Sequence, residues 1–245
     1  MRMKTRTAAL GLATVLLGTP LATVSLAANA TAATTTTASV TSAAAGRPTL
    51  NKGATGPSVS YLQTRLKALH YDPGALDGKY GTNTVYAVWA FQKVNGIKPS
   101  STVGTSTWKA LAKPKTPKAL IHGGASSRIE INLKTQLLVF YKNSKITLIS
   151  HISSGSGKRY YSRGSWHKAV TPTGNFKIFR RIKGWHRSAL GLLYNPVYFS
   201  GGVAVHGEGS VPLYPASHGC VRIPVHTGDL VYPLASMGTR VYVRR

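Results

Sequence analysis

The residues best suited to chemistry in this chain surround its single cysteine, Cys220. His218 and Gly219 stand directly before the cysteine, Arg222 follows it, and a second histidine, His206, lies upstream. A lone thiol cannot form a disulfide within its own chain. Imidazole and guanidinium groups beside it favour the thiolate, which is the nucleophilic form of sulfur. The pattern predicts a nucleophilic cysteine rather than a structural one.

Two histidines near a thiol can divide the work of acyl transfer between them. His206 follows the apolar run Val203–Val205, so a strand is expected to hold it, and we assign it as general base and later acid. His218 is too close to Cys220 in sequence to align freely as the base. We expect it to orient the loop and to stabilise the thiolate.

The remaining residues of the run suit the later stages of such a reaction. Gly219 allows the backbone to pass close to a substrate, so the amides around Gly219 and Cys220 are expected to bind the tetrahedral oxyanion. Arg222 is always charged and bidentate, which suits a substrate carboxylate.

A zinc site is the main alternative, with His206, His218, Cys220 and His226 as ligands. Structural zinc sites favour paired cysteines, which this chain lacks. A simple buried cysteine would not need two histidines and an arginine nearby. We therefore favour a nucleophilic cysteine over both of these alternatives.

Several other side chains are open to two interpretations. Glu208 and Asp229 are candidates to orient a histidine, although a backbone carbonyl would serve equally well. Trp185, His186 and Tyr194 either line a substrate pocket or, as we favour, pack in the core.

The first residues have the pattern of an export signal. Basic residues precede the apolar stretch 8–17, and small residues follow at 28–30, so residues 1–30 are predicted to be a secretory signal peptide. The apolar stretch is shorter than the roughly 20 residues of a membrane-spanning helix. An uncleaved anchor is the alternative. We expect a secreted, extracytoplasmic, cell-wall-associated protein.

Charge is strongly lopsided, with 31 basic against 5 acidic residues and a net charge of +26. Such a field attracts polyanions, and outside a cell these include anionic wall polymers. No nucleic-acid-binding motif accompanies the charge, so nucleic acid is not an expected partner. The run 158–167 interleaves cations with aromatics, either as an active-site flap that grips glycan or wall polymer or as an ordinary exposed loop.

Composition divides the chain into an α+β multidomain protein. Residues 31–48 form an Ala/Thr-rich disordered linker, and residues 113–127 form a Pro/Lys linker. Residues 49–112 show helical periodicity, and residues 128–245 show the alternation of strands. A small three-helix module is therefore followed by a mainly β domain.

Helices are predicted from Val59, with Ser58 as its cap, over 82–95 and over 105–111. Strands are predicted at the following ranges: 129–133, 137–141, 146–152, 176–179, 203–206 and 241–243. Asn143 and Ser144 fit the turn of a hairpin.

The run HGEGSVPLYPASHGCVR, residues 206–222, resembles the active-site signature of the L,D-transpeptidase catalytic (YkuD-like) domain. Residues 171–176 resemble the turn before a central strand of that family, and 129–141, with Gln136, its opening hairpin. The resemblance covers residues 128–245, and its SHGC motif is highly specific.

Residues 59–97 resemble the three-helix type of peptidoglycan-binding domain through their LQ, DG-x-YG and AV-x-x-FQ elements. That resemblance covers residues 49–112. The two resemblances together imply an enzyme of the cell wall that uses neither a metal nor an organic cofactor.

The resemblance implies a secreted cysteine acyltransferase for cell-wall organisation. Cys220 would attack the carbonyl between the third residue and D-Ala of a peptidoglycan tetrapeptide stem, release D-Ala, and pass the acyl group to an amine in a 3→3 cross-link. His206 matches the proton donor and acceptor. Ser217, His218 and Gly219 match the supporting residues, and Ser217 and Arg222 are taken as substrate-binding. Arg222 stands where many members carry Asn.

The expected partners are peptidoglycan stems and glycan, with carbapenem-type β-lactams as covalent inhibitors of a monomeric enzyme. An L,D-carboxypeptidase acting on the same stems and a non-catalytic wall-binding protein are the alternatives. Cell-wall endopeptidases of the NlpC type place cysteine before histidine, and sortases separate the two more widely than this chain does.

Overall fold

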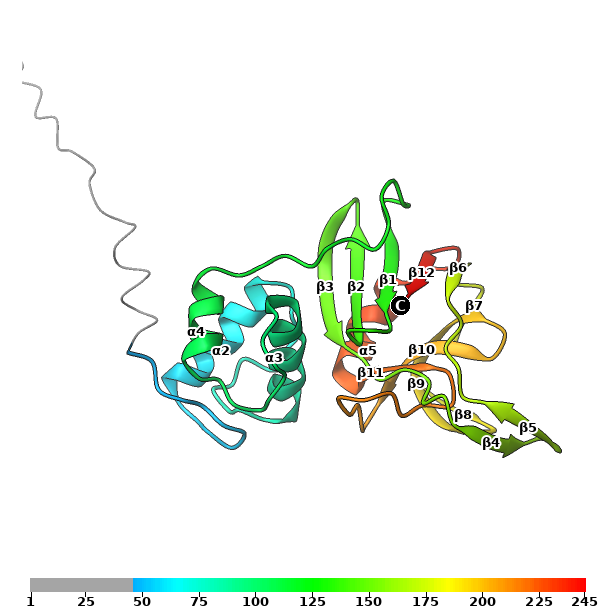
Figure 1. Ribbon diagram of the computed structural model, residues 1–245, viewed down its shortest axis with the longest axis horizontal. Coiled ribbons are helices and arrows are strands. Elements are labelled where there is room, and N and C mark those ends of the chain that lie inside the picture. Colours follow the sequence, from blue (N-terminus) through cyan, green and yellow to red (C-terminus); the bar gives the residue numbers. More distant parts are fainter. Residues whose placement is uncertain (1–45) are drawn as a thin grey trace, which may run out of the picture. The chain divides into compact units, whose positions relative to one another are not determined.

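The computed structural model describes residues 46–245 (Figure 1). The predicted signal peptide and nearly all of the predicted linker 31–48 lie outside the described residues. Within 46–245, no helix is both long and apolar enough to cross a membrane.

Three helices form the first part of the described chain: α2 (Pro57–Ala68), α3 (Thr82–Asn95) and α4 (Thr105–Ala112). Their apolar positions at spacings of three and four point into one core, with Val59, Leu62 and Leu66 fully buried. The bounds predicted for α3 are confirmed, and Gly96 ends that helix in the left-handed conformation (φ 74°).

The predicted cap of the first helix is wrong. Pro57 occupies the first turn and Gly56 is the N-cap, with no side-chain capping hydrogen bond, so Ser58 lies inside the helix. Proline has the φ of a first helical turn and no N–H to satisfy, which lets this helix begin without a polar cap.

Strands after residue 127 form two larger sheets, and the first has the order β3-β2-β1-β12-β6. Its strands are β1 (Arg128–Asn132), β2 (Leu137–Lys142), β3 (Lys145–His151), β6 (Gly174–Lys177) and β12 (Arg240–Arg244). Asn143 (φ 50°) and Ser144 (φ 62°) make the turn between β2 and β3, as predicted.

Strand β2 is apolar on both faces because both faces are covered. Leu138 and Phe140 belong to the core between the two sheets. Leu137, Val139 and Tyr141 belong to the same buried cluster as the three helices. This explains why residues 137–141 form a continuous apolar run instead of an alternating one.

The second sheet has the order β11-β10-β9-β7, with β8 paired to β9. Its strands are β7 (Arg180–Arg181), β8 (Trp185–Ser188), β9 (Gly191–Ser200), β10 (Val203–Glu208) and β11 (Val221–Pro224). Helix α5 (Val225–Leu234) contacts β9, β10 and β11. A separate hairpin, β4 (Arg159–Ser162) with β5 (Ser165–Lys168), projects from this domain in Figure 1. The loop from β10 to β11 carries the cysteine motif.

Candidate active site

The parallel pair β10–β11 brings His206 and Cys220 together. Its register aligns Val205 with Val221 and His206 with Arg222. Side chains alternate between the two faces of a strand, and extending that alternation by one residue places Cys220 on the same face as His206. Both residues line one cavity of about 770 Å³. The proposed nucleophile and base therefore share a cleft.

The thiol of Cys220 lies against the backbone at the turn from β9 to β10 and at the start of β10. It accepts a hydrogen bond from the Ala204 N–H (3.5 Å) and donates one to the Gly202 carbonyl (3.7 Å). Burial raises the pKa of Cys220, and the Ala204 amide and the charge of Arg222 oppose that rise only in part. The expectation of a resting thiolate is therefore wrong, because desolvation outweighs the nearby positive charge.

His206 is buried, and burial lowers its pKa. Its Nδ1 lies 3.0 Å from the carbonyl oxygen of Gly207. A carbonyl can only accept, so Nδ1 carries the proton and Nε2 is left with a lone pair. A neutral imidazole with a free Nε2 is the form that a general base needs.

His218 takes a different position from the one expected. It is exposed, and its ring stands edge-on to Tyr160 with centroids 4.7 Å apart. The groups that lower the pKa of Cys220 are Ala204 and Arg222. His218 thus contacts the β4–β5 hairpin and lines the same cavity as Cys220, and it is not among the groups that lower the pKa of the thiol.

Ser217 lines the cavity, but its hydroxyl is used inside the loop. It donates to the Cys220 carbonyl and accepts from the Gly219 N–H (3.0 Å). Ser217 therefore holds the loop in place of the expected substrate contact, and the Gly219 amide is not free for an oxyanion. Within residues 46–245 the Cys220 N–H has no hydrogen-bond acceptor, which leaves it as the available donor.

Thr171 is a positioning residue that the sequence did not identify as one. Its hydroxyl donates to the Gly219 carbonyl (2.7 Å) and accepts from the Gly155 N–H (2.9 Å). Gly219 has a φ of 136°, and a Cβ there would stand 3.0 Å from the Val170 carbonyl oxygen. The loop before the cysteine therefore requires glycine at this position.

The two acids proposed to orient a histidine contact other groups. Glu208 lies 4.0 Å from the Arg222 guanidinium, and Asp229 accepts hydrogen bonds from Tyr194 (2.7 Å) and Asn195 (3.1 Å). The backbone carbonyl that binds His206 takes their place. Arg222 faces the cavity with Glu208 as its partner.

Arginines from three strands and from the turn between β4 and β5 converge on the cavity. Arg163, Arg180 and Arg187 line it together with Arg222. The chain has only five acids, and each has its own partners: Asp72 with Lys67 and His226, Asp77 with Gln63 and Lys79, Glu130 with Arg128, Glu208 with Arg222, and Asp229 with Tyr194 and Asn195. The first three arginines therefore face the cavity without a carboxylate partner from residues 46–245.

Of the ring-bearing residues expected in the core, one is exposed at the surface and another lines the cavity. Trp185 is 56% exposed, so core packing is wrong for it, and its ring lies 5.0 Å from that of Tyr194. His186 lines the cavity, where Tyr198 is a further member.

The alternative of a zinc site gains no geometric support. Among residues 46–245 no three His, Cys, Asp or Glu side chains gather closely enough to hold a metal ion. His226, one of the four candidate ligands, contacts the carboxylate of Asp72 (3.2 Å).

Comparison with known proteins agrees with this architecture. The L,D-transpeptidase catalytic domain (YkuD) family matches residues 126–243, and the putative peptidoglycan binding domain family matches residues 55–111. A crystal structure of the L,D-transpeptidase from Xylanimonas cellulosilytica DSM 15894 is 38% identical, with a TM-score of 0.76 over 81% of this chain and 98% of that one.

Two curated proteins match a shorter part of the chain. A probable N-acetylmuramoyl-L-alanine amidase of Bacillus licheniformis is 43% identical over 72 residues, and the spore cortex-lytic enzyme of Bacillus subtilis (strain 168) 39% over 70. These matches cover 29% and 28% of this chain but only 20% and 23% of those proteins.

A cysteine–histidine cleft in a two-sheet domain, preceded by a three-helix module, defines the class of protein. The chain belongs to the L,D-transpeptidase family, with a YkuD catalytic domain and an N-terminal peptidoglycan-binding domain.

Proposed function

We propose that this chain is an exported cysteine L,D-transpeptidase that forms 3→3 cross-links between peptidoglycan stems. The observation that carries the proposal is the shared cleft of Cys220 and His206, with Nε2 of the histidine unprotonated. The peptidoglycan-binding module supports a wall substrate, because tethering raises the local concentration of stems around the catalytic domain.

The reaction begins with a neutral thiol and a neutral imidazole. The Cys220 sulfur bonds to the carbonyl carbon that precedes D-Ala while His206 Nε2 takes the thiol proton. The negative charge on the carbonyl oxygen is stabilised by the Cys220 N–H. The C–N bond then breaks, and the imidazolium returns its proton to the departing D-Ala nitrogen, which leaves a thioester on Cys220.

The second half of the reaction reverses the proton path. A side-chain amine of another stem attacks the thioester carbon, and His206 takes a proton from that amine. The C–S bond breaks, and the proton passes to the sulfur, which restores the thiol. Water in place of the amine makes the same acyl-enzyme a carboxypeptidase, which is the alternative activity.

The arginines of the cavity support a substrate that carries carboxylates. Arg163, Arg180 and Arg187 lack acidic partners, and a peptide stem supplies α-carboxylates that guanidinium groups bind well. We propose that these arginines orient the donor stem. Arg187→Gln should raise KM more than it lowers kcat, because a bound carboxylate makes this contact in the ground state as well as in the transition state.

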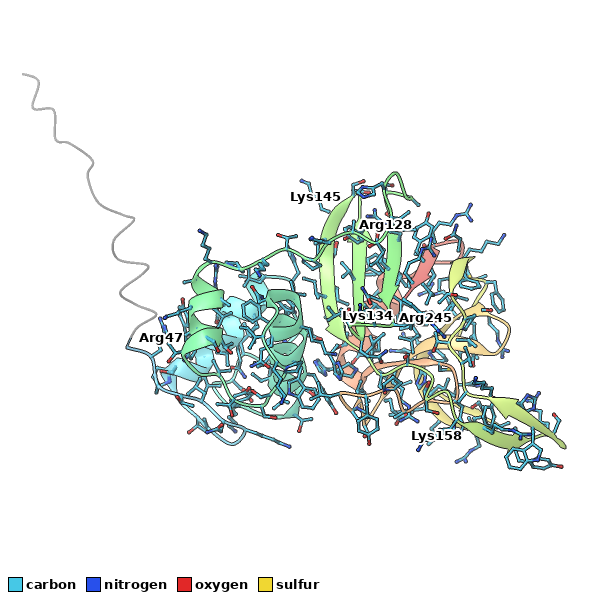
Figure 2. All side chains as sticks on the ribbon, viewed as in Figure 1. Arg47, Arg128, Lys134, Lys145, Lys158 and Arg245 are labelled. Atoms are coloured by element: carbon cyan, nitrogen blue, oxygen red, sulfur yellow. The ribbon has the colours of Figure 1, made fainter. Side chains whose placement is uncertain are left out.

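Incubation of the purified protein with a disaccharide-tetrapeptide, followed by mass spectrometry, tests the proposal. Dimers lacking one D-Ala are expected from the wild type, whereas tripeptide alone would favour the carboxypeptidase. Cys220→Ser should abolish both products, and His206→Ala should slow them by about 10² to 10⁴. Lys145→Ala, an exposed change at the turn between β2 and β3 (Figure 2), is the control. Full activity of Cys220→Ser would refute the mechanism.

Carbapenem binding provides a second test at the same atom. A carbapenem should acylate the sulfur of Cys220 as its ring opens, with a mass increase equal to the whole drug. His206→Ala should slow this acylation as well, because the thiol proton then lacks an acceptor. An adduct of equal yield on Cys220→Ser would place the modification elsewhere.

A further inference from the structure

The β4–β5 hairpin has two chemically different faces. Its register pairs Tyr160 with His167 and Tyr161 with Trp166, so the members of each pair share one face. No other strand pairs with it among residues 46–245, and it stands out from the domain in Figure 1.

The inner face belongs to the catalytic cavity. Tyr160 stacks on His167 (5.5 Å between centroids) and stands edge-on to His218 (4.7 Å). Tyr160, Ser162 and His167 all line the cavity. The side chains of the inner face are therefore part of the cavity wall.

The outer face carries two large aromatic rings in contact with solvent. Tyr161 is 62% exposed and Trp166 is 61% exposed, and their centroids lie 5.6 Å apart in an edge-to-face arrangement. A hairpin gains little stability from rings that remain exposed. Paired exposed aromatics are typical of surfaces that bind a partner.

Positive charge surrounds these rings. The Arg159 guanidinium lies 5.1 Å from the Trp166 ring, and Lys168 is opposite Arg159 on the same face. Lys158 precedes β4 at the base of the hairpin (Figure 2). The five acids of the chain all have partners outside the hairpin, so no carboxylate of residues 46–245 pairs with these cations.

We propose that the outer face of the β4–β5 hairpin is a binding site for an anionic polysaccharide, separate from the catalytic cavity. Trp166 and Tyr161 offer flat apolar faces to the C–H groups of successive sugar rings. Arg159 and Lys168 pair with the carboxylate or phosphate groups between them. A neutral glycan would contact only the aromatic rings, and a polyanion without sugars would contact only the cations.

Such a site would hold the wall polymer beside the entrance of the cavity, because the same hairpin lines that cavity with its inner face. Binding at the outer face requires no turnover. Failure of the transpeptidase reaction and failure of this site are therefore separate results.

The test measures binding of the full chain by isothermal titration calorimetry. The probes are an oligouronate, a glycerol-phosphate polymer bearing sugars, neutral dextran, inorganic polyphosphate and phosphatidylglycerol vesicles. The sugar-bearing anions should bind more tightly than dextran or polyphosphate, and the tighter of the two identifies uronate or phosphate as the charged group. Affinity should fall with added salt, since the charged contacts are exposed.

The double variant Y161A/W166A should bind the sugar-bearing anions at least about fivefold more weakly while polyphosphate binding changes little. Arg159→Gln should weaken both anion types. Tyr214→Ala is the matched control, because that ring is 67% exposed and lies outside the hairpin.

The proposal is overturned if Y161A/W166A binds the sugar-bearing anions as the wild type does. It is also overturned if dextran or polyphosphate binds as tightly as they do. Vesicle binding that depends on Trp166, without polysaccharide binding, would instead indicate a membrane surface.

Discussion

A buried histidine should make this protein unusually sensitive to acid. His151, at the end of β3, is only 1% exposed. Its Nε2 lies 2.9 Å from the Val211 carbonyl and 3.1 Å from that of Pro212, and its Nδ1 lies 2.8 Å from Lys93 Nζ. Since carbonyls only accept, Nε2 carries the proton and Nδ1 accepts from the lysine. The surroundings accommodate neutral histidine only.

The effect of pH on stability has a definite sign. Burial first, and then the charge of Lys93, lowers the pKa of His151 from 6.5 to about 3 in the folded protein. Between these values the unfolded chain binds a proton that the folded chain does not. The contribution of neutral His151 to stability is therefore fully present above the unfolded pKa of the histidine, and it falls as the pH drops below that value. At about pH 4.5 the deficit is about 3 kcal/mol, from about two pH units at about 1.4 kcal/mol each.

Urea unfolding at neutral pH and at about pH 4.5 measures this deficit, with His151→Gln as the perturbation. Glutamine donates to a carbonyl but does not titrate, so the variant is expected to be less stable at neutral pH and to lose about 3 kcal/mol less on acidification. His122→Gln, at an exposed histidine, is the control. Equal acid losses in the wild type and His151→Gln would refute the reasoning.

Three further perturbations test the catalytic loop. Alkylation of Cys220 by iodoacetamide should rise with pH through a midpoint above that of a free thiol, and Arg222→Met should move the midpoint higher, because the guanidinium charge lowers the thiol pKa. Gly219→Ala should cost about 1–3 kcal/mol in urea unfolding, since its φ is positive and the Val170 carbonyl blocks the new methyl group; an unchanged midpoint would contradict this. Thr171→Val should cost about 1–3 kcal/mol and slow acylation by a carbapenem, whereas retention of both stability and rate would show that the two hydrogen bonds of this hydroxyl are dispensable.

The sequence predicted those helices and hairpins whose formation depends on residues close to one another in the chain. Helix α3 was predicted from its apolar spacing, and the β2–β3 hairpin was predicted from Asn143 and Ser144. The cap at Ser58 failed because the adjacent Pro57 offered another way to begin the helix.

Elements whose pattern depends on tertiary burial were missed. Strand β9 contains Pro196, and the strand pairs with β7, β8 and β10, so its burial does not alternate simply. Helix α5 contains Gly228 and Pro233, which weaken a helical pattern, and it is stabilised by packing on the second sheet.

The residues of the candidate site divide in the same way, into those predicted from a local motif and those brought together only by the tertiary fold. Cys220 and His206 were found because both belong to one continuous run of the chain, residues 206–222, which begins within β10. Arg180 and Arg187 were not, since they belong to separate short strands that meet only when the second sheet forms. The sequence shows that these residues are positively charged, but only the folded structure shows that they have no acidic partner among residues 46–245.

The opposite pKa shifts of Cys220 and His206 determine when the nucleophile can form. Burial favours the neutral form of each group, so moving the thiol proton to the imidazole creates two charges in a desolvated cleft. That transfer becomes favourable when the sulfur simultaneously bonds to carbon and the charge moves to the carbonyl oxygen near the Cys220 N–H. The free enzyme therefore keeps a weakly reactive thiol, and reactivity depends on a bound acyl donor. Iodoacetamide should accordingly react slowly with Cys220 at neutral pH while a carbapenem reacts fast, and rapid alkylation at that pH would show that a thiolate already exists in the free enzyme.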